Sequence, residues 1–180
     1  MVAFKKILFP TDFSPNADRA LAHAIRLADF DGGEVIVQHV VSNYFEKHPH
    51  WATLFDIHEM QKYMQGYVDG HMKKVLSGHS GNVRVRTEIS KGKPAEEIAA
   101  AAERELVDLV VCDSRMPGKT GIDLLIELRR TESAVPVLMI SAFADAMVEA
   151  AVRRLGALDV LKKPIRRQEL VARTAKVVGG

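Results

Sequence analysis

Four polar side chains stand at the ends of apolar runs, where they could act together on a phosphoryl group. Asp12 follows "KILFPT" and Asp113 follows "DLVVC", while Ser141 ends "VPVLMI" and Lys163 follows "LDVLK". A carboxylate can attack phosphorus as a nucleophile, and two nearby carboxylates can hold Mg²⁺, which prefers hard oxygen ligands. A lysine and a hydroxyl can offset and position the charge of the transferring group. The set predicts Mg²⁺-dependent phosphoryl chemistry if the fold brings its members together.

The segment "GKT", residues 118–120, suggests a rival interpretation as the end of a phosphate-binding loop. The pattern GxxxxGK[ST] requires a glycine five residues before Gly118, and that position is Asp113. A carboxylate there repels phosphate and lacks the backbone freedom of glycine. We therefore reject the phosphate-binding loop and retain Asp113 as a candidate nucleophile.

Apolar runs alternate with segments of helical period along the whole chain, and this alternation predicts a mainly parallel sheet covered by helices on both faces. Strands are predicted at 4–10, 34–41, 83–89, 108–112, 135–141 and 158–164, and helices at 14–30, 56–77, 94–105, 120–131, 144–155 and 166–177. Ligands of such sheets bind beyond the carboxyl ends of the strands, which is where the four polar side chains stand. The irregular stretch 42–54 is predicted to be a lid or a surface loop.

Composition narrows the class of protein. The chain has 180 residues, which is long enough for one well-covered core. Its formal net charge of +2 is too small to create the strong positive potential expected of a protein that binds nucleic acid or membranes. No apolar run is as long as a membrane span. Cys112 is the only cysteine, which excludes an internal disulfide and predicts a reducing, cytoplasmic location.

From Asp108 onward the sequence resembles the second half of a response-regulator receiver domain. The segments "DLVVCDSRMPGKTGIDLLIELR", "VPVLMISAFAD" and "GALDVLKKPI" match in order the family's phosphoacceptor strand and turn, its strand ending in Ser/Thr-Ala, and its Lys-Pro signature. The resemblance implies that Asp113 is the phosphoacceptor and that Ser141 and Lys163 contact the phosphoryl group. It also implies a cis peptide bond after Lys163.

The same resemblance implies a metal site. Asp12, Asp113 and the backbone carbonyl of Arg115 would hold Mg²⁺, the implied cofactor. Receivers usually carry two acids after the first strand, whereas this chain has Thr11 and then Asp12. Asp12 aligns with the acid that contacts the metal directly.

Residues 1 to about 111 resemble a different family, the universal stress proteins. The segments "FKKILFPTDFSPNADRALAHAIRLA", "GEVIVQHVV" and "GKPAEEIAAAAERELVDLVV" are similar to its first strand and helix, its second strand, and its Gly-x-Pro helix with the fourth strand. Many members bind ATP through the Asp after the first strand, which is Asp12 here, and through a glycine motif after the fourth strand. That glycine motif is absent from this chain.

Together the resemblances imply a fusion within one sheet, with a stress-protein-like half at 1–111 and a receiver-like half at 112–180. The implied fold is a single α/β domain, a three-layer doubly wound sandwich of flavodoxin or Rossmann type. Its parallel six-stranded sheet would have the order 3-2-1-4-5-6, with the phosphoacceptor strand at the switch point.

The leading functional hypothesis is therefore a phosphoacceptor signalling domain, not an enzyme, in a two-component phosphorelay. Its expected partners are a histidine kinase or phosphotransfer protein and a second copy of the chain, with no nucleic acid or membrane partner. Two alternatives remain open at this point. One is an ATP-binding module of universal stress type that uses Asp12, and the other is a folded chimera with neither activity.

Overall fold

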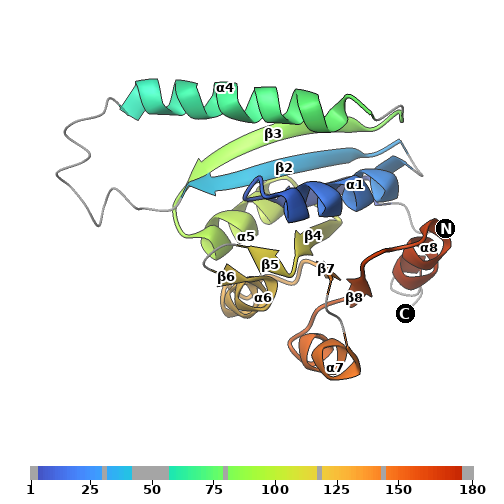
Figure 1. The fold of residues 1–180 in the computed structure, drawn as a ribbon. Helices are drawn as coiled ribbons and strands as arrows, with labels where there is room; N and C mark the ends of the chain where they lie inside the picture. The colour runs from blue at the N-terminus through green and yellow to red at the C-terminus, as the bar shows by residue number, and fades with distance from the viewer. Residues whose placement is uncertain are drawn as a thin grey trace.

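The computed structural model describes residues 4–29, 32–41, 57–78, 81–116, 119–142 and 145–175. Strands and helices alternate along the chain as predicted (Figure 1), in the order β1 (Lys6–Pro10), α1 (Pro15–Asp29), β2 (Glu34–Val41), α4 (Ile57–Leu76), β3 (Arg84–Lys91), α5 (Pro94–Arg104), β4 (Leu109–Asp113), β5 (Arg115–Met116), β6 (Lys119–Thr120), α6 (Gly121–Arg130), β7 (Val137–Ser141), α7 (Ala146–Arg154), β8 (Asp159–Lys162) and α8 (Arg167–Ala175). The predicted loop at 42–54 lies outside the described residues.

The main sheet has six parallel strands in the order β3-β2-β1-β4-β7-β8, which confirms the predicted order 3-2-1-4-5-6. The chain moves outward from β1 to β3 and then returns to the other side of β1 with β4. This reversal creates a switch point between β1 and β4, where open α/β sheets bind their ligands. The fold is of flavodoxin-like α/β type.

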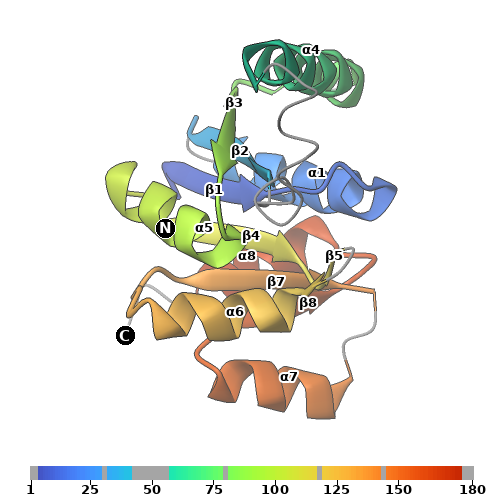
Figure 2. The ribbon, with the colours of Figure 1, turned by 90° about the vertical axis from the view of Figure 1, so that its left-hand side faces the viewer.

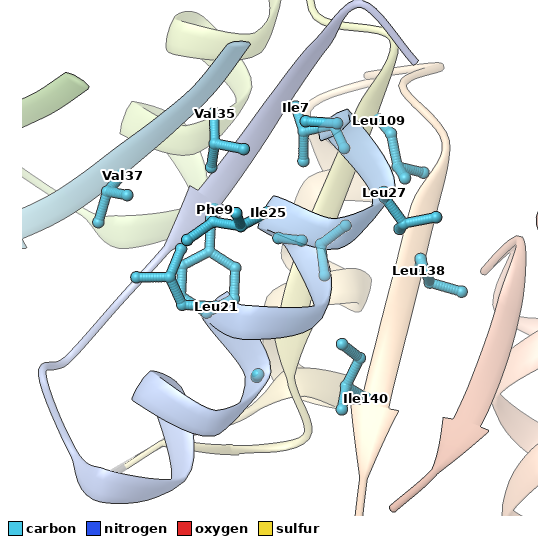
Figure 3. Close-up of a cluster of buried hydrophobic side chains, with 14 of the residues drawn as sticks. Ile7, Phe9, Leu21, Ile25, Leu27, Val35, Val37, Leu109, Leu138 and Ile140 are labelled. Atoms are coloured by element: carbon cyan, nitrogen blue, oxygen red, sulfur yellow. The ribbon is translucent and has the colours of Figure 1, made fainter. Parts of the chain in front are cut away.

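Two apolar layers cover the sheet. One joins α1, α4 and α8 to one face, and Figure 3 shows Leu21, Ile25 and Leu27 of α1 packed against that face. The other joins α5, α6 and α7 to the opposite face. Figure 2 shows α5 and α6 on one side of the sheet and α1 on the other. No helix in the described part of the chain is long and apolar enough to cross a membrane.

The alternation of side chains along β4 determines the direction of the residues that follow. Leu109 and Val111 belong to the layer under α1, whereas Val110 and Cys112 belong to the layer under α5 and α6. Successive side chains of a strand point to opposite faces. Asp113 therefore continues the row that faces α1.

Local signals set the helix ends near the strand tips. Thr120 caps α6, since its side chain accepts a hydrogen bond from the amide of Asp123 while the Asp123 carboxylate accepts one from the amide of Thr120. Asp145 caps α7 by accepting from the amide of Val148. These caps begin α6 and α7 soon after the strands that end in Asp113 and Ser141.

Candidate functional site

The ends of β1, β4, β7 and β8 lie side by side, because these are four consecutive strands of the sheet. Asp113 is level with Ile140 of β7, and Ser141 is level with Lys162 of β8. Leu8 of β1 is level with Val110 of β4, so continuing that register sets the residues after β1 beside Asp113. The sheet thus brings all four candidate positions to one edge.

Asp113 and Lys163 form an ion pair at this edge. The Lys163 Nζ donates to Asp113 Oδ2 at 3.0 Å, and the two side chains are only 14% and 4% exposed. The same Nζ donates to the backbone carbonyl of Asn16, in the first turn of α1, at 3.1 Å. Lys163 therefore connects the Asp113 carboxylate to the helix that follows β1. The bond from Lys163 to Pro164 is cis, as the resemblance implied.

Asp12 follows β1 in a tight turn and has one oxygen with no hydrogen bond. Its Oδ1 accepts from the amide of Ser14 at 2.9 Å, whereas its Oδ2 is buried and has no partner. Phe13 has a left-handed backbone with φ of 59°, which reverses the chain between Asp12 and the Ser14 cap of α1. A buried carboxylate oxygen without a donor carries a desolvation cost that a cation could remove.

Ser141 is 4% exposed and makes a hydrogen bond to a residue absent from the predicted set. The Ser114 hydroxyl donates to the Ser141 hydroxyl at 2.9 Å. Ser114 follows Asp113 directly, and its amide donates to the carbonyl of Ile140 at 2.8 Å. Ser141 therefore ends the strand next to β4, and its hydroxyl accepts a hydrogen bond from Ser114.

Arg115 lies two residues beyond Asp113 in β5, which pairs with β6 in a short antiparallel ribbon. The ribbon leads directly into α6 at Gly121, whose amide donates to the carbonyl of Ser114 at 2.9 Å. A Cβ on Gly121 would lie 2.7 Å from the carbonyl oxygen of Asp113, so only glycine allows this approach. The Pro-Gly pair at 117–118 lies outside the described residues.

Histidines and an aromatic ring surround the turn that contains Asp12. The centroid of the Phe13 ring lies 4.8 Å from that of His39, and 5.2 Å and 5.8 Å from the ring centroids of His71 and Tyr67 on α4. His71 Nε2 lies 2.8 Å from Asp18 Oδ1, which ties α4 to the first turn of α1. This packing holds the turn beneath α4.

Two further titratable groups lie near the site. Burial, with added contributions from Arg26 and Lys163, lowers the pKa of His23 on α1 to about 4, so the ring is neutral at pH 7. Burial and the adjacent Asp113 raise the pKa of Cys112 to about 12. The thiol of Cys112 is therefore unreactive at neutral pH.

The donor set fits a hard divalent cation. Asp12 and Asp113 supply carboxylates from adjacent strand ends, and the buried Asp12 Oδ2 lacks a hydrogen-bond donor. Among the described residues, no three His, Cys, Asp or Glu side chains group into a metal cluster. A site with two carboxylates suits Mg²⁺, which usually keeps several waters and takes one or two protein carboxylates.

Sequence reasoning missed two contacts of this site. It included Ser141 and Lys163 but not their partners, the Ser114 hydroxyl and the Asn16 carbonyl. A serine directly after Asp113 was a visible signal for the first contact. A backbone carbonyl leaves no signal in the sequence. The roles predicted for Asp12, Asp113, Arg115, Ser141 and Lys163 remain predictions.

Comparison with known proteins gives two similarities that overlap in this chain. Residues 67–175 match the family of the response regulator receiver domain. The transcriptional regulatory protein CpxR of Klebsiella pneumoniae is 42% identical over 82 residues, which is 46% of this chain and 35% of CpxR. Universal stress protein MJ0577 of Methanocaldococcus jannaschii is 29% identical in an alignment 158 residues long that covers 77% of this chain and 96% of that protein.

Solved structures show similarity to the same two kinds of protein, a universal stress protein and a receiver domain. The MJ0577 structure covers 80% of this chain with a TM-score of 0.60 and 26% identity, and the whole of that chain is covered. The signal receiver domain of NarL from Mycobacterium tuberculosis covers 99% of both chains with a TM-score of 0.51 and 16% identity, which is similarity of fold alone.

The extents of these matches bear on the predicted fusion. The chain spans almost all of MJ0577 but only about a third of CpxR. The receiver match begins at residue 67, well before residue 111, and the MJ0577 match covers more of the chain than residues 1–111 alone. Similarity to both families is thus established, whereas a join near residue 111 stays a prediction.

Proposed function

The chain belongs to the response regulator receiver domain family, and from this premise we propose that it accepts a phosphoryl group on Asp113 in a Mg²⁺-dependent reaction. The observation that carries the proposal is the buried pair of Asp113 and Lys163, with Nζ and Oδ2 at 3.0 Å between the ends of β4 and β8, the two strands that flank β7. An acceptor needs a carboxylate at a ligand-binding edge, with a cation beside it to offset the negative charge of the phosphoryl group.

The proposed reaction uses an oxygen of Asp113 as the nucleophile. It forms a bond to phosphorus as the bond between phosphorus and the donor's nitrogen or oxygen breaks, and the leaving group departs with that electron pair. Lys163 offsets the charge that gathers on the phosphoryl oxygens, and the Ser141 hydroxyl donates to one of them. Mg²⁺, when bound by Asp12, Asp113 and the Arg115 carbonyl, supplies the remaining positive charge.

In this proposal the chain acts as an acceptor and switch in a phosphorelay, not as an enzyme with its own substrate. A histidine kinase or a phosphotransfer protein is the donor that the receiver family implies. A second copy of the chain remains a proposed partner.

Intact mass after incubation with acetyl phosphate and Mg²⁺ tests the proposal. We expect one phosphoryl adduct that disappears when EDTA is present and in Asp113→Asn. Asp69→Asn, an exposed carboxylate on α4, is the matched control and should keep the adduct. An adduct that survives Asp113→Asn, or no adduct on the unaltered chain, would refute the acceptor role.

A second candidate function is ATP binding of universal stress type, and the extensive similarity to MJ0577 favours it. Asp12, with its unpartnered Oδ2, would contact the nucleotide. Calorimetry with ATP and Mg²⁺ separates the candidates. Tight binding that is lost in Asp12→Ala but survives in Asp113→Asn would support nucleotide binding. If the chain forms no phosphoryl adduct and binds no nucleotide, it is a folded chimera without either activity.

A further inference from the structure

Ser141 and Asp113 lie at neighbouring strand ends, but their side chains belong to opposite faces of the sheet. In β7, Leu138 and Ile140 pack in the layer under α1, and Val137 and Met139 pack in the layer under α5 and α6. Strand alternation sets Ser141 on the side of Met139. Asp113 is on the other side, where Lys163 and the first turn of α1 meet it.

Ser114 holds the Ser141 hydroxyl on that far side. The hydrogen bond between the two hydroxyl groups is 2.9 Å long, and Ser141 is 4% exposed. Ser114 is itself anchored at both ends of its backbone. Its amide donates to the carbonyl of Ile140 at 2.8 Å, and its carbonyl accepts from the amide of Gly121 at 2.9 Å. The Ser114 side chain therefore starts from a backbone position fixed by β7 and α6.

We propose that Ser114 is a latch that holds the Ser141 hydroxyl away from Asp113 until Asp113 carries a phosphoryl group. The inference rests on the proposed acceptor function. For Ser141 to donate to a phosphoryl oxygen on Asp113, its side chain must rotate about the Cα–Cβ bond toward the α1 side. That rotation breaks the hydrogen bond to Ser114. Ser114 is thus a positioning residue that opposes the phosphorylated state by the net value of one hydrogen bond.

The latch makes an unusual prediction, because removing a polar contact should strengthen ligand binding. In Ser114→Ala the Ser141 hydroxyl no longer has to leave Ser114. The affinity for beryllofluoride with Mg²⁺, a mimic of the phosphoryl group, should rise about 2- to 10-fold, as expected for one net hydrogen bond. Ser114→Cys keeps the side-chain shape but donates weakly, so its gain should be smaller.

Calorimetric titration of beryllofluoride in excess Mg²⁺ tests the latch on the full chain. Ser141→Ala should bind more weakly than the unaltered chain, and adding Ser114→Ala to it should change nothing further, because no hydroxyl remains to be released. A general structural effect of Ser114→Ala would persist in that background. Ser77→Ala, an exposed serine after α4, is the matched control and should bind as the unaltered chain does.

Each outcome separates the latch from the acceptor role. Tighter binding in Ser114→Ala that vanishes when Ser141 is also replaced supports the latch. Unchanged or weaker binding in Ser114→Ala, with normal binding by the unaltered chain, overturns the latch and leaves the acceptor role intact. If Ser114→Ala does not fold, Ser114→Cys decides by the same criterion. No binding and no phosphoryl adduct on the unaltered chain overturn both.

Discussion

The ion pair of Asp113 and Lys163 makes the stability of the chain sensitive to one substitution, Lys163→Met. The substitution keeps most of the side-chain volume but removes the ammonium from a carboxylate that is 4% exposed. Breaking a buried pair by removing one partner costs about 3–5 kcal/mol, because a buried charge is left without its counter-charge. Loss of the hydrogen bond to the Asn16 carbonyl adds about 1 kcal/mol. We expect Lys163→Met to lower the free energy of unfolding by about 4–6 kcal/mol.

Replacing the carboxylate as well should restore part of this loss. The double variant Lys163→Met with Asp113→Asn has no buried charge at this position, so it should be more stable than Lys163→Met alone. The coupling between the two substitutions should be about 2–3 kcal/mol in a double-mutant cycle. Mg²⁺ should stabilise Lys163→Met but not the double variant, because a cation that binds the folded chain at Asp113 raises its unfolding free energy.

Urea denaturation at pH 7, with and without Mg²⁺, measures all four corners of the cycle. Lys73→Met, at an exposed lysine of α4, is the matched control and should change the unfolding free energy by less than about 0.5 kcal/mol. A loss below about 1 kcal/mol in Lys163→Met would show that the pair is not held as a buried ion pair. A double variant as unstable as the sum of the single variants would refute the coupling.

Three further predictions concern residues around the pair. Asp12→Asn keeps the turn but removes a charge, so calorimetry should find Mg²⁺ affinity at least about tenfold lower, and unchanged affinity would exclude Asp12 as a ligand. Gly121→Ala should lower the unfolding free energy by about 1–3 kcal/mol, because its Cβ would meet the Asp113 carbonyl at 2.7 Å. Gly66→Ala, in open space on α4, is the control. It should raise the unfolding free energy by about 1 kcal/mol in the same urea denaturation assay. The pKa of His23 is lowered from 6.5 to about 4, so the unfolded chain binds more protons than the folded chain between these pH values, and the free energy of unfolding falls as the pH drops from 6.5 towards 4. For a half-buried ring we expect this loss of unfolding free energy to be about 1–2 kcal/mol. His23→Gln should remove that part of the pH dependence in a denaturation assay.

Much of the fold followed from the pattern of apolar residues. The run "DLVVC" predicted a strand buried on both faces, and β4 is buried along its whole length. Pro94 predicted the start of a helix, and α5 begins there. Helix and strand periods differ enough for such assignments, and parallel strands must end at a common edge. The arrival of the four candidate positions at one edge of the sheet was therefore predictable before any contact was known.

The hydrogen bonds within the site were not predictable in the same way. The bond from Ser114 to Ser141 depends on the register of β4 against β7, and a shift of one residue would separate the two hydroxyl groups. The two-residue strands β5 and β6 are too short to give a periodic signal. The left-handed backbone of Phe13 has no signal in its own side chain, since a bulky residue rarely adopts that conformation.

The two candidate functions both use Asp12, so we expect their ligands to oppose each other at one edge of the sheet. Asp12 would contact Mg²⁺ in the acceptor role and the nucleotide in the stress-protein role, while Lys163 joins Asp113 to the first turn of α1 that follows Asp12. A phosphoryl group on Asp113 adds negative charge beside the strand end where the nucleotide phosphates would lie. Because coupling between two sites is reciprocal, a chain able to do both should bind ATP more weakly once beryllofluoride is bound, by the factor with which ATP weakens beryllofluoride binding. Paired calorimetric titrations measure this factor from both directions, and binding of each ligand that is independent of the other would mean that the ligands do not share this edge.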